Sequence, residues 1–119
     1  MAEAQSTSLY APTALVFTLA QGDNLTAPVI RAVTLNCAPT PRGTHPLPEA
    51  ACAALNAAGG SFDHQLASPD THRVCPMIYA PVTLTADGVW QGDRVAWKHT
   101  FSNTCVMSAT LNGTPVFAF

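Results

Sequence analysis

The sequence predicts an α+β fold, a sandwich in which a five-stranded antiparallel sheet carries two helices on one face, with two disulfides. Three observations support this prediction. Several segments rich in strand formers end at turn residues, one alanine-rich segment has helix start and stop signals, and the four cysteines form an even set. At 119 residues, the chain is expected to be a single domain spanning residues 1–119, with about residues 1–7 flexible.

Two strands are expected in the first third of the chain and one at its end. The first, Ala14–Asn24, closes on a Gly-Asp-Asn turn. The second, Ile30–Cys37, alternates, but Ile30 and Ala32 compete with Val33 or Leu35 for its faces, so its register stays open. The closing stretch "PVFAF", residues 115–119, is expected to form the last strand.

The clearest strand signal is a hairpin between Pro81 and Asn103. Asp87-Gly88 and Gly92-Asp93 are both turn signals within it. The second arm alternates, so its two faces can be assigned. One face is predicted to hold Val95, Trp97, His99 and Phe101, and the other Arg94, Ala96, Lys98 and Thr100.

One helix is predicted within residues 46–60, "PLPEAACAALNAAGG". Prolines stand at its start, alanines fill it, and Gly59-Gly60 ends it. Cys52 and Leu55 are three residues apart and therefore share a face. A shorter helical turn near residues 62–66 is a second candidate.

The four cysteines, Cys37, Cys52, Cys75 and Cys105, permit three disulfide pairings. We predict Cys37–Cys52 and Cys75–Cys105, because each bridge closes a loop that otherwise lacks a core. The chain-entropy formula gives roughly 3–4 kcal/mol of stabilisation for each. Disulfides imply an oxidising compartment, and the alternative is four free thiols in a reducing one. The sequence has no C-x-x-C pair, which argues against a structural zinc.

Composition and motifs exclude several function classes. A net charge of −2 gives no basic surface for nucleic acid, and no apolar run approaches the roughly 20 residues of a membrane span. No signal peptide is visible at the N-terminus. The histidines, His45, His64, His72 and His99, form no H-E-x-x-H pattern. We therefore expect no metal, no cofactor, no nucleic acid partner and no membrane partner.

The stretch "RVCPMIYAPVTL", residues 73–84, is the strongest functional candidate. A cysteine and two prolines stiffen the chain around Met77, Ile78 and Tyr79, which are large and apolar. It lies in a long irregular segment, and such segments inside a compact domain are usually functional or disordered. Two other interpretations of this stretch remain open. It could be an apolar strand that fills the core, or Cys75 could be a catalytic nucleophile.

Five motifs, in order, carry a family resemblance: "RAVTLNCAP", "GTHP", "CPMIYAPV", "DGVWQGDRV" and "FSNTC". With them, the chain resembles the Streptomyces subtilisin inhibitor family from "SLYAPTALVFTLA" to the terminal "VFAF". The resemblance implies a secreted, extracellular protein that inhibits subtilisin-like serine proteases and is not itself an enzyme. Some family members also restrain small metalloproteases, and the sequence leaves that second target open.

The resemblance also implies the roles of individual residues. The protease-binding residues would be Cys75, Pro76, Met77, Ile78 and Tyr79. Met77–Ile78 would be the scissile bond, and Met77 would fill the protease's primary specificity pocket. Asn103, in "FSN", would support the loop from beneath.

A homodimer is the last expectation. Helices on one face would leave the other face of the sheet bare, and the strands carry few charges to suit water. A second copy related by a twofold axis would cover that face. The resemblance implies the same sheet-to-sheet dimer, with Val16 near its centre.

Two rival functions stay open at this stage. One is an extracellular binding or structural domain that shares the scaffold without inhibiting a protease. The other is a small secreted enzyme.

Overall fold

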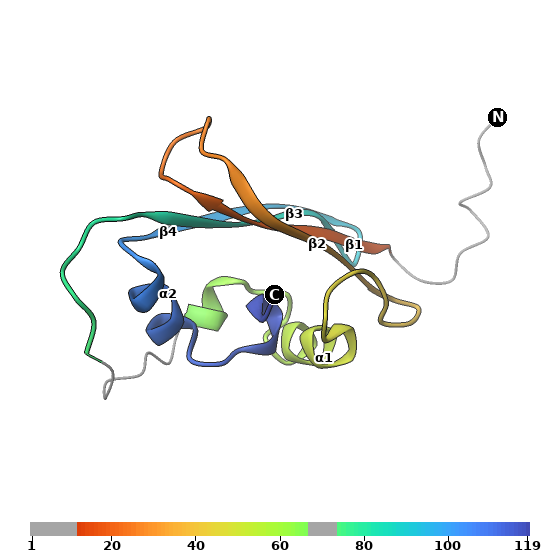
Figure 1. The fold of residues 1–119 in the computed structure, drawn as a ribbon. Coiled ribbons are helices and arrows are strands. Elements are labelled where there is room, and N and C mark those ends of the chain that lie inside the picture. The colour runs from red at the N-terminus through yellow and green to blue at the C-terminus, as the bar shows by residue number, and fades with distance from the viewer. Residues whose placement is uncertain (1–11, 67–73) are drawn as a thin grey trace.

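The computed structural model describes residues 12–66 and 74–119, and its framework is an antiparallel sheet (Figure 1). The strands are β1 (Thr13–Gln21), β2 (Val29–Ala38), β3 (Val82–Trp90) and β4 (Asp93–Phe101). They lie side by side in the order β2-β1-β3-β4, and every neighbouring pair is antiparallel. The N-terminal stretch that was expected to be flexible, residues 1–7, lies outside the described residues.

All helical elements lie on one face of this sheet, as predicted for an α+β fold with two disulfides (Figure 1). They are α1 (Pro48–Ala57), α2 (Thr104–Leu111) and two 3₁₀ turns, η2 (Asp63–Leu66) and η3 (Pro115–Phe117). The sequence predicted α1 and the short turn η2, but it did not predict α2. No helix among the described residues has the length and apolarity needed to cross a membrane.

The core lies between the sheet and the helical layer, and Phe17 of β1 is at its centre. Leu15, Phe17 and Leu19 alternate inward along β1 and are buried. The Phe17 ring meets the edges of Phe62 and Phe117, with ring centroids 6.0 and 5.7 Å apart. Such edge-to-face contacts add to the free energy gained by burying the aromatic surface.

The predicted faces of β4 are confirmed. The four residues of the face with Trp97 are buried or half-buried, and the four of the face with Lys98 are exposed. Trp97 stacks on Phe117 at 5.3 Å, and its indole N–H donates to the carboxylate of Asp63 over 2.9 Å. This bond fixes η2 beneath the edge strand.

The prediction of a fifth strand at residues 115–119 is wrong: in the described residues the sheet has four strands, and Pro115–Phe117 forms η3. Val116 and its neighbour Phe117 are both buried, whereas a strand would point them to opposite faces. Thr114 caps the turn by accepting the Val116 N–H at 3.4 Å, and Pro115 has no N–H to give a strand ladder. The apolar stretch therefore winds under the sheet.

A buried histidine fastens this C-terminal segment to the loop before α1. The backbone N–H of Leu47 donates to Nδ1 of His45 over 3.0 Å. The hydrogen of the neutral ring therefore sits on Nε2, which donates to the Val116 carbonyl over 2.8 Å. His45 is 3% exposed, so both bonds replace water that the ring has lost.

The β3–β4 hairpin turns at Gln91-Gly92, and the prediction of a turn at Asp87-Gly88 is wrong. Gln91 and Gly92 have φ of 48° and 89°, as a two-residue hairpin turn requires. Gly88 lies inside β3, with φ of +139° and the position of an added Cβ 2.1 Å from the Ala14 carbonyl oxygen. A glycine at this position lets β1 and β3 approach each other closely.

Replacement of Gly88 tests this packing. Gly88→Ala should lower the free energy of unfolding by about 3 kcal/mol or more, because backbone strain and a clash with β1 add together. Gly59→Ala is the matched control: φ is +64° there, but an added Cβ meets nothing within 4 Å. The control should lower the free energy of unfolding by only about 1–2 kcal/mol. Equal losses in urea unfolding would show that the close approach at Gly88 has no energetic importance.

Candidate functional site

The segment 74–81 leaves the body of the molecule as an irregular arc that leads into β3 (Figure 1). It carries the most exposed large apolar side chains next to one another: Met77 is 102% exposed, Ile78 60% and Tyr79 67%. A protein rarely presents such a run to water unless another molecule binds it. The alternative in which this stretch fills the core is therefore wrong.

Two disulfides are formed, and they have the predicted pairing. Cys75–Cys105 joins the arc to the first turn of α2, and Cys37–Cys52 joins β2 to α1. The sulfur of Cys75 is thus bonded, so this residue is no catalytic nucleophile. The covalent bond instead fixes the chain two residues before Met77.

Asn103 holds the backbone on both sides of Met77. Its amide Nδ2 donates to the carbonyl of Pro76 over 3.1 Å and to that of Ile78 over 2.8 Å. Its Oδ1 accepts the N–H of Val106 over 2.9 Å, which makes Asn103 the N-cap of α2. Asn103 is 7% exposed, so one buried side chain fixes the arc and starts a helix.

The far end of the arc joins the sheet directly. The N–H of Ala80 donates to the carbonyl of Ser102 over 2.8 Å, and Val82 then pairs with Phe101 in the β3–β4 ladder. Pro76 and Pro81 fix two φ angles within the arc. The backbone at Met77 is thus held from behind while its side chain faces solvent, which suits binding by a partner better than chemistry on a substrate.

Tyr79 makes a contact that the sequence analysis missed. Its hydroxyl donates to Oδ2 of Asp23, in the β1–β2 loop, over 2.6 Å. This hydrogen bond raises the pKa of Tyr79, with smaller contributions from burial and from repulsion between the carboxylate and the phenolate. No local pattern could have revealed the contact, since 56 residues separate the two side chains.

The remaining predicted residue, Val16, is not part of the arc. It lies on β1, opposite Thr34 of β2 and Asp87 of β3, and is 43% exposed. The structure therefore places the predicted dimer contact and the predicted protease contact at separate positions. Within residues 12–66 and 74–119, no three His, Cys, Asp or Glu side chains gather as a metal site would need.

Comparison with known proteins identifies the family. The profile described as subtilisin inhibitor-like matches residues 11–103. The chain belongs to the subtilisin inhibitor-like family. The family predicted from the sequence motifs is thus confirmed.

Similar proteins carry inhibitor names. Subtilisin inhibitor-like protein 8 of Streptomyces virginiae is 62% identical over 111 residues, which cover 92% of this chain and all of that protein. Trypsin inhibitor STI2 of Streptomyces longisporus is 50% identical over 113 residues, covering 94% of this chain and 76% of that protein. These relatives are protease inhibitors and not enzymes.

A solved structure resembles the fold closely. It is the crystal structure of Streptomyces caespitosus sermetstatin in complex with Bacillus licheniformis subtilisin. The two chains are 62% identical and align with a TM-score of 0.87 over 91% of this chain and 99% of the other.

The two roles of Asn103 can be separated by substitution. Asn103→Asp keeps an oxygen that caps α2 but loses the N–H groups that bond the Pro76 and Ile78 carbonyls. We expect the free energy of unfolding to fall by about 1–3 kcal/mol, because two hydrogen bonds are lost and a carboxylate oxygen then faces two carbonyl oxygens. Cleavage of the arc by a low-specificity protease should be about tenfold faster or more, because two hydrogen bonds are lost.

Asn103→Ala, which loses the cap as well, should be both less stable and faster to be cleaved. Urea unfolding and mass analysis of the fragments measure the two effects. If Asn103→Asp were cleaved at the parent's rate, the two amide bonds would not be what holds the arc.

Proposed function

We propose that this protein inhibits subtilisin-like serine proteases by binding them like a substrate, with Met77–Ile78 as the scissile bond. The observation that carries the proposal is the full exposure of Met77 between two carbonyls that Asn103 holds. Membership of the subtilisin inhibitor-like family supports it, as does the likeness to sermetstatin in its complex with subtilisin.

The geometry explains why such a loop would bind tightly. Met77 is long, uncharged and flexible, which suits a wide apolar specificity pocket. The chain on either side of it is already ordered by the Cys75 disulfide and by Asn103, so little conformational entropy remains to be lost. Protease–inhibitor interfaces of this kind bury roughly 1,600 Å².

The same contacts explain why the loop would be a poor substrate. The protease serine attacks the Met77 carbonyl, and the amine of Ile78 leaves as an acyl-enzyme forms. That amine stays near the ester, because the Ile78 carbonyl is bonded to Asn103 and the Ala80 N–H to Ser102. It can attack the ester and restore the peptide bond before water does.

Secretion forms part of the proposal. Both disulfides need an oxidising compartment, and the proposed targets are extracellular enzymes.

A titration tests the proposed function directly. Subtilisin activity should fall in proportion to added protein and reach zero at one reactive loop per enzyme. The protein should remain largely intact during the assay. If subtilisin lost no activity, the alternative hypothesis of a binding domain would be favoured. Rapid cleavage of this protein without inhibition would show that it is an ordinary substrate. A secreted metalloprotease, titrated in parallel, decides whether this chain has that second target.

Specificity should follow residue 77. Met77→Lys should tighten inhibition of trypsin by about 100-fold, or about 2.7 kcal/mol, since an acidic specificity pocket rewards a cation. Met77→Gly should weaken subtilisin binding by about 2–4 kcal/mol through loss of the anchor. Stability should change by less than about 0.5 kcal/mol in Met77→Lys, because the parent side chain is fully exposed.

Ala53→Lys, on the exposed face of α1, adds the same charge away from the loop and serves as the control. Inhibition constants for both enzymes provide the measurement. Parent-like inhibition of both enzymes by both Met77 variants would show that another residue fills the pocket.

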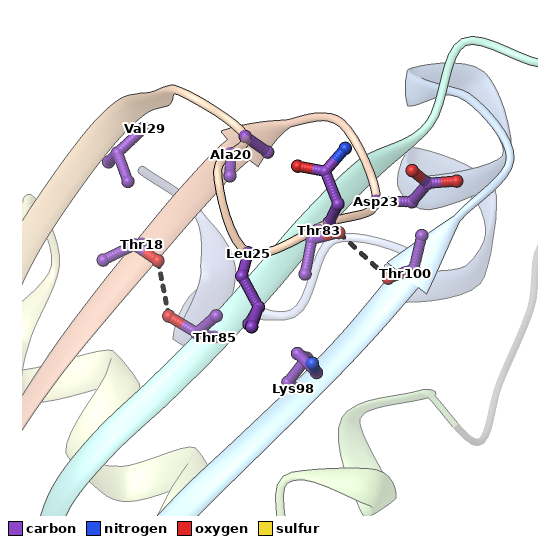
Figure 2. A pocket seen from close by; sticks show the side chains of 11 residues that line it. Thr18, Ala20, Asp23, Leu25, Val29, Thr83, Thr85, Lys98 and Thr100 are labelled. Carbon is purple, nitrogen blue, oxygen red and sulfur yellow. Dashed lines mark hydrogen bonds between the residues drawn. The ribbon is translucent and has the colours of Figure 1, made fainter.

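We also propose that two copies form a dimer through the outer face of the sheet, which is the face without helices (Figure 1). Val16 is exposed there, between Thr34 of β2 and the exposed Asp87 of β3, and further threonines lie along the neighbouring strands. Many of these hydroxyls already bond one another, as Thr18 does with Thr85 and Thr83 with Thr100 (Figure 2). A partner covering them would leave few polar groups unsatisfied.

Sedimentation equilibrium tests the dimer. The parent should sediment at twice the 12.5 kDa mass of one chain at micromolar concentration. Val16→Lys should shift it towards 12.5 kDa, because the interface would have to bury a lysine charge, and the Asp87 carboxylate opposite offsets only part of that desolvation cost. Ala53→Lys, on the helical layer, should not.

The two reactive loops should both be free in the dimer, so it should bind two proteases. A 12.5 kDa parent species would exclude the dimer. One protease per dimer at saturation would show that the loops do not both face outward.

A further inference from the structure

The β1–β2 loop, Gly22–Pro28, is held in one conformation although most of it is exposed. The N–H of Gln21 donates to the Pro28 carbonyl over 2.9 Å, which closes the base of the loop. Within it, Oδ1 of Asn24 accepts the N–H of Thr26 over 3.0 Å and its hydroxyl over 2.8 Å. These bonds form a local Asx turn, so the loop is ordered without help from a partner.

This loop is also tied to the strand that follows the reactive arc. The hydroxyl of Thr83, the second residue of β3, donates to the Gly22 carbonyl over 2.8 Å. Figure 2 shows the loop folded over the outer face of the sheet, with Asp23 near the Thr83–Thr100 pair. Asp23 therefore has a fixed position relative to the start of β3, which lies three residues after Tyr79.

Among the described residues, the side chain of Tyr79 forms one hydrogen bond, and its acceptor is Asp23. Asn103 bonds the carbonyl of Ile78 and Ser102 bonds the N–H of Ala80, so the backbone is fixed on both sides of Tyr79. The phenol itself is two-thirds exposed and is held by its 2.6 Å hydrogen bond to the carboxylate. A bond of that length between a hydroxyl and a carboxylate is charge-assisted and well directed.

We propose that Asp23 is a positioning residue for inhibition, which orients Tyr79 so that the half of the loop after the scissile bond is ordered before a protease arrives. The inference rests on the proposed function. A free tyrosine side chain would have to be ordered on binding, and Asp23 removes that cost in advance. The side chain stays two-thirds exposed to the enzyme while its hydroxyl is engaged.

The contact has a second consequence after cleavage. The new chain end begins at Ile78, and its order depends on the anchors that follow: the Ile78 carbonyl, the Tyr79 hydroxyl and the Ala80 N–H. Removing the middle anchor lets the freed amine move away from the acyl-enzyme more often. Loss of Asp23 should therefore raise both the inhibition constant and the fraction of cleaved protein at equilibrium with subtilisin.

Four variants of the full chain test the inference: Asp23→Ala, Asp23→Asn, Tyr79→Phe and the double variant Asp23→Ala/Tyr79→Phe. Asp23→Ala should raise the inhibition constant for subtilisin about three- to tenfold, the cost of ordering one side chain. Asp23→Asn keeps an acceptor for the hydroxyl and should lie within about twofold of the parent. The double variant should be no weaker than Tyr79→Phe alone, because the two side chains act as one unit.

Asp93→Ala is the matched control: it removes one exposed carboxylate at the opposite end of the β3–β4 hairpin. Its inhibition constant should equal the parent's. Ultraviolet titration gives an independent readout, in which Asp23→Ala should lower the pKa of Tyr79, and Tyr10→Phe identifies which tyrosine titrates. Urea unfolding should show Asp23→Ala to be as folded as Asp93→Ala.

The outcomes separate this inference from the proposed function. If the parent fails to inhibit subtilisin, the proposed function is wrong and the inference is lost with it. If the parent inhibits and Asp23→Ala matches Asp93→Ala, the inference alone is wrong. It is equally overturned if the effects of Asp23→Ala and Tyr79→Phe add independently, because Asp23 would then act through another contact.

Discussion

The carboxamide of Asn103 is the constraint on which the arrangement of this protein depends. Its oxygen starts α2, and its N–H groups hold the two carbonyls that flank Met77. Buried amides must satisfy their hydrogen bonds, so the helix start and the loop position are fixed by one side chain. Asn103 lies two residues after the end of β4. The β3–β4 hairpin therefore fixes the position of Asn103, and through it the position of the arc 74–81.

Apolar packing and polar contacts have different roles in this molecule. The sheet and the helical layer bury the aromatic groups around Phe17, and this burial supplies most of the driving force for folding. Polar contacts, by contrast, concentrate where a segment without its own core must be positioned: His45 fixes the C-terminal turn, and Asp23 fixes Tyr79. Directional bonds determine position at those sites, and apolar packing determines that the chain is folded at all.

Much of this could be predicted from the sequence because the signals are local. Alternation gave the faces of β4, and alanines between proline and glycine gave α1. The segment 104–111 is rich in β-branched residues and weakly amphipathic, so only the Asn103 N-cap hinted at a helix. The prediction of a fifth strand was wrong because tertiary packing buries two adjacent residues, Val116 and Phe117. The Asp23–Tyr79 contact could not be predicted because it joins positions that no periodicity connects.

Met77 buries none of its own surface in the folded chain. No core packing and no hydrogen bond of its side chain therefore selects the residue at this position, and the free energy of folding is nearly indifferent to it. Natural selection can then change the target enzyme by single substitutions that need no compensating change elsewhere. A lineage built on this scaffold can diversify its targets as fast as mutations at one codon arise, and the buried framework can stay constant while it does so.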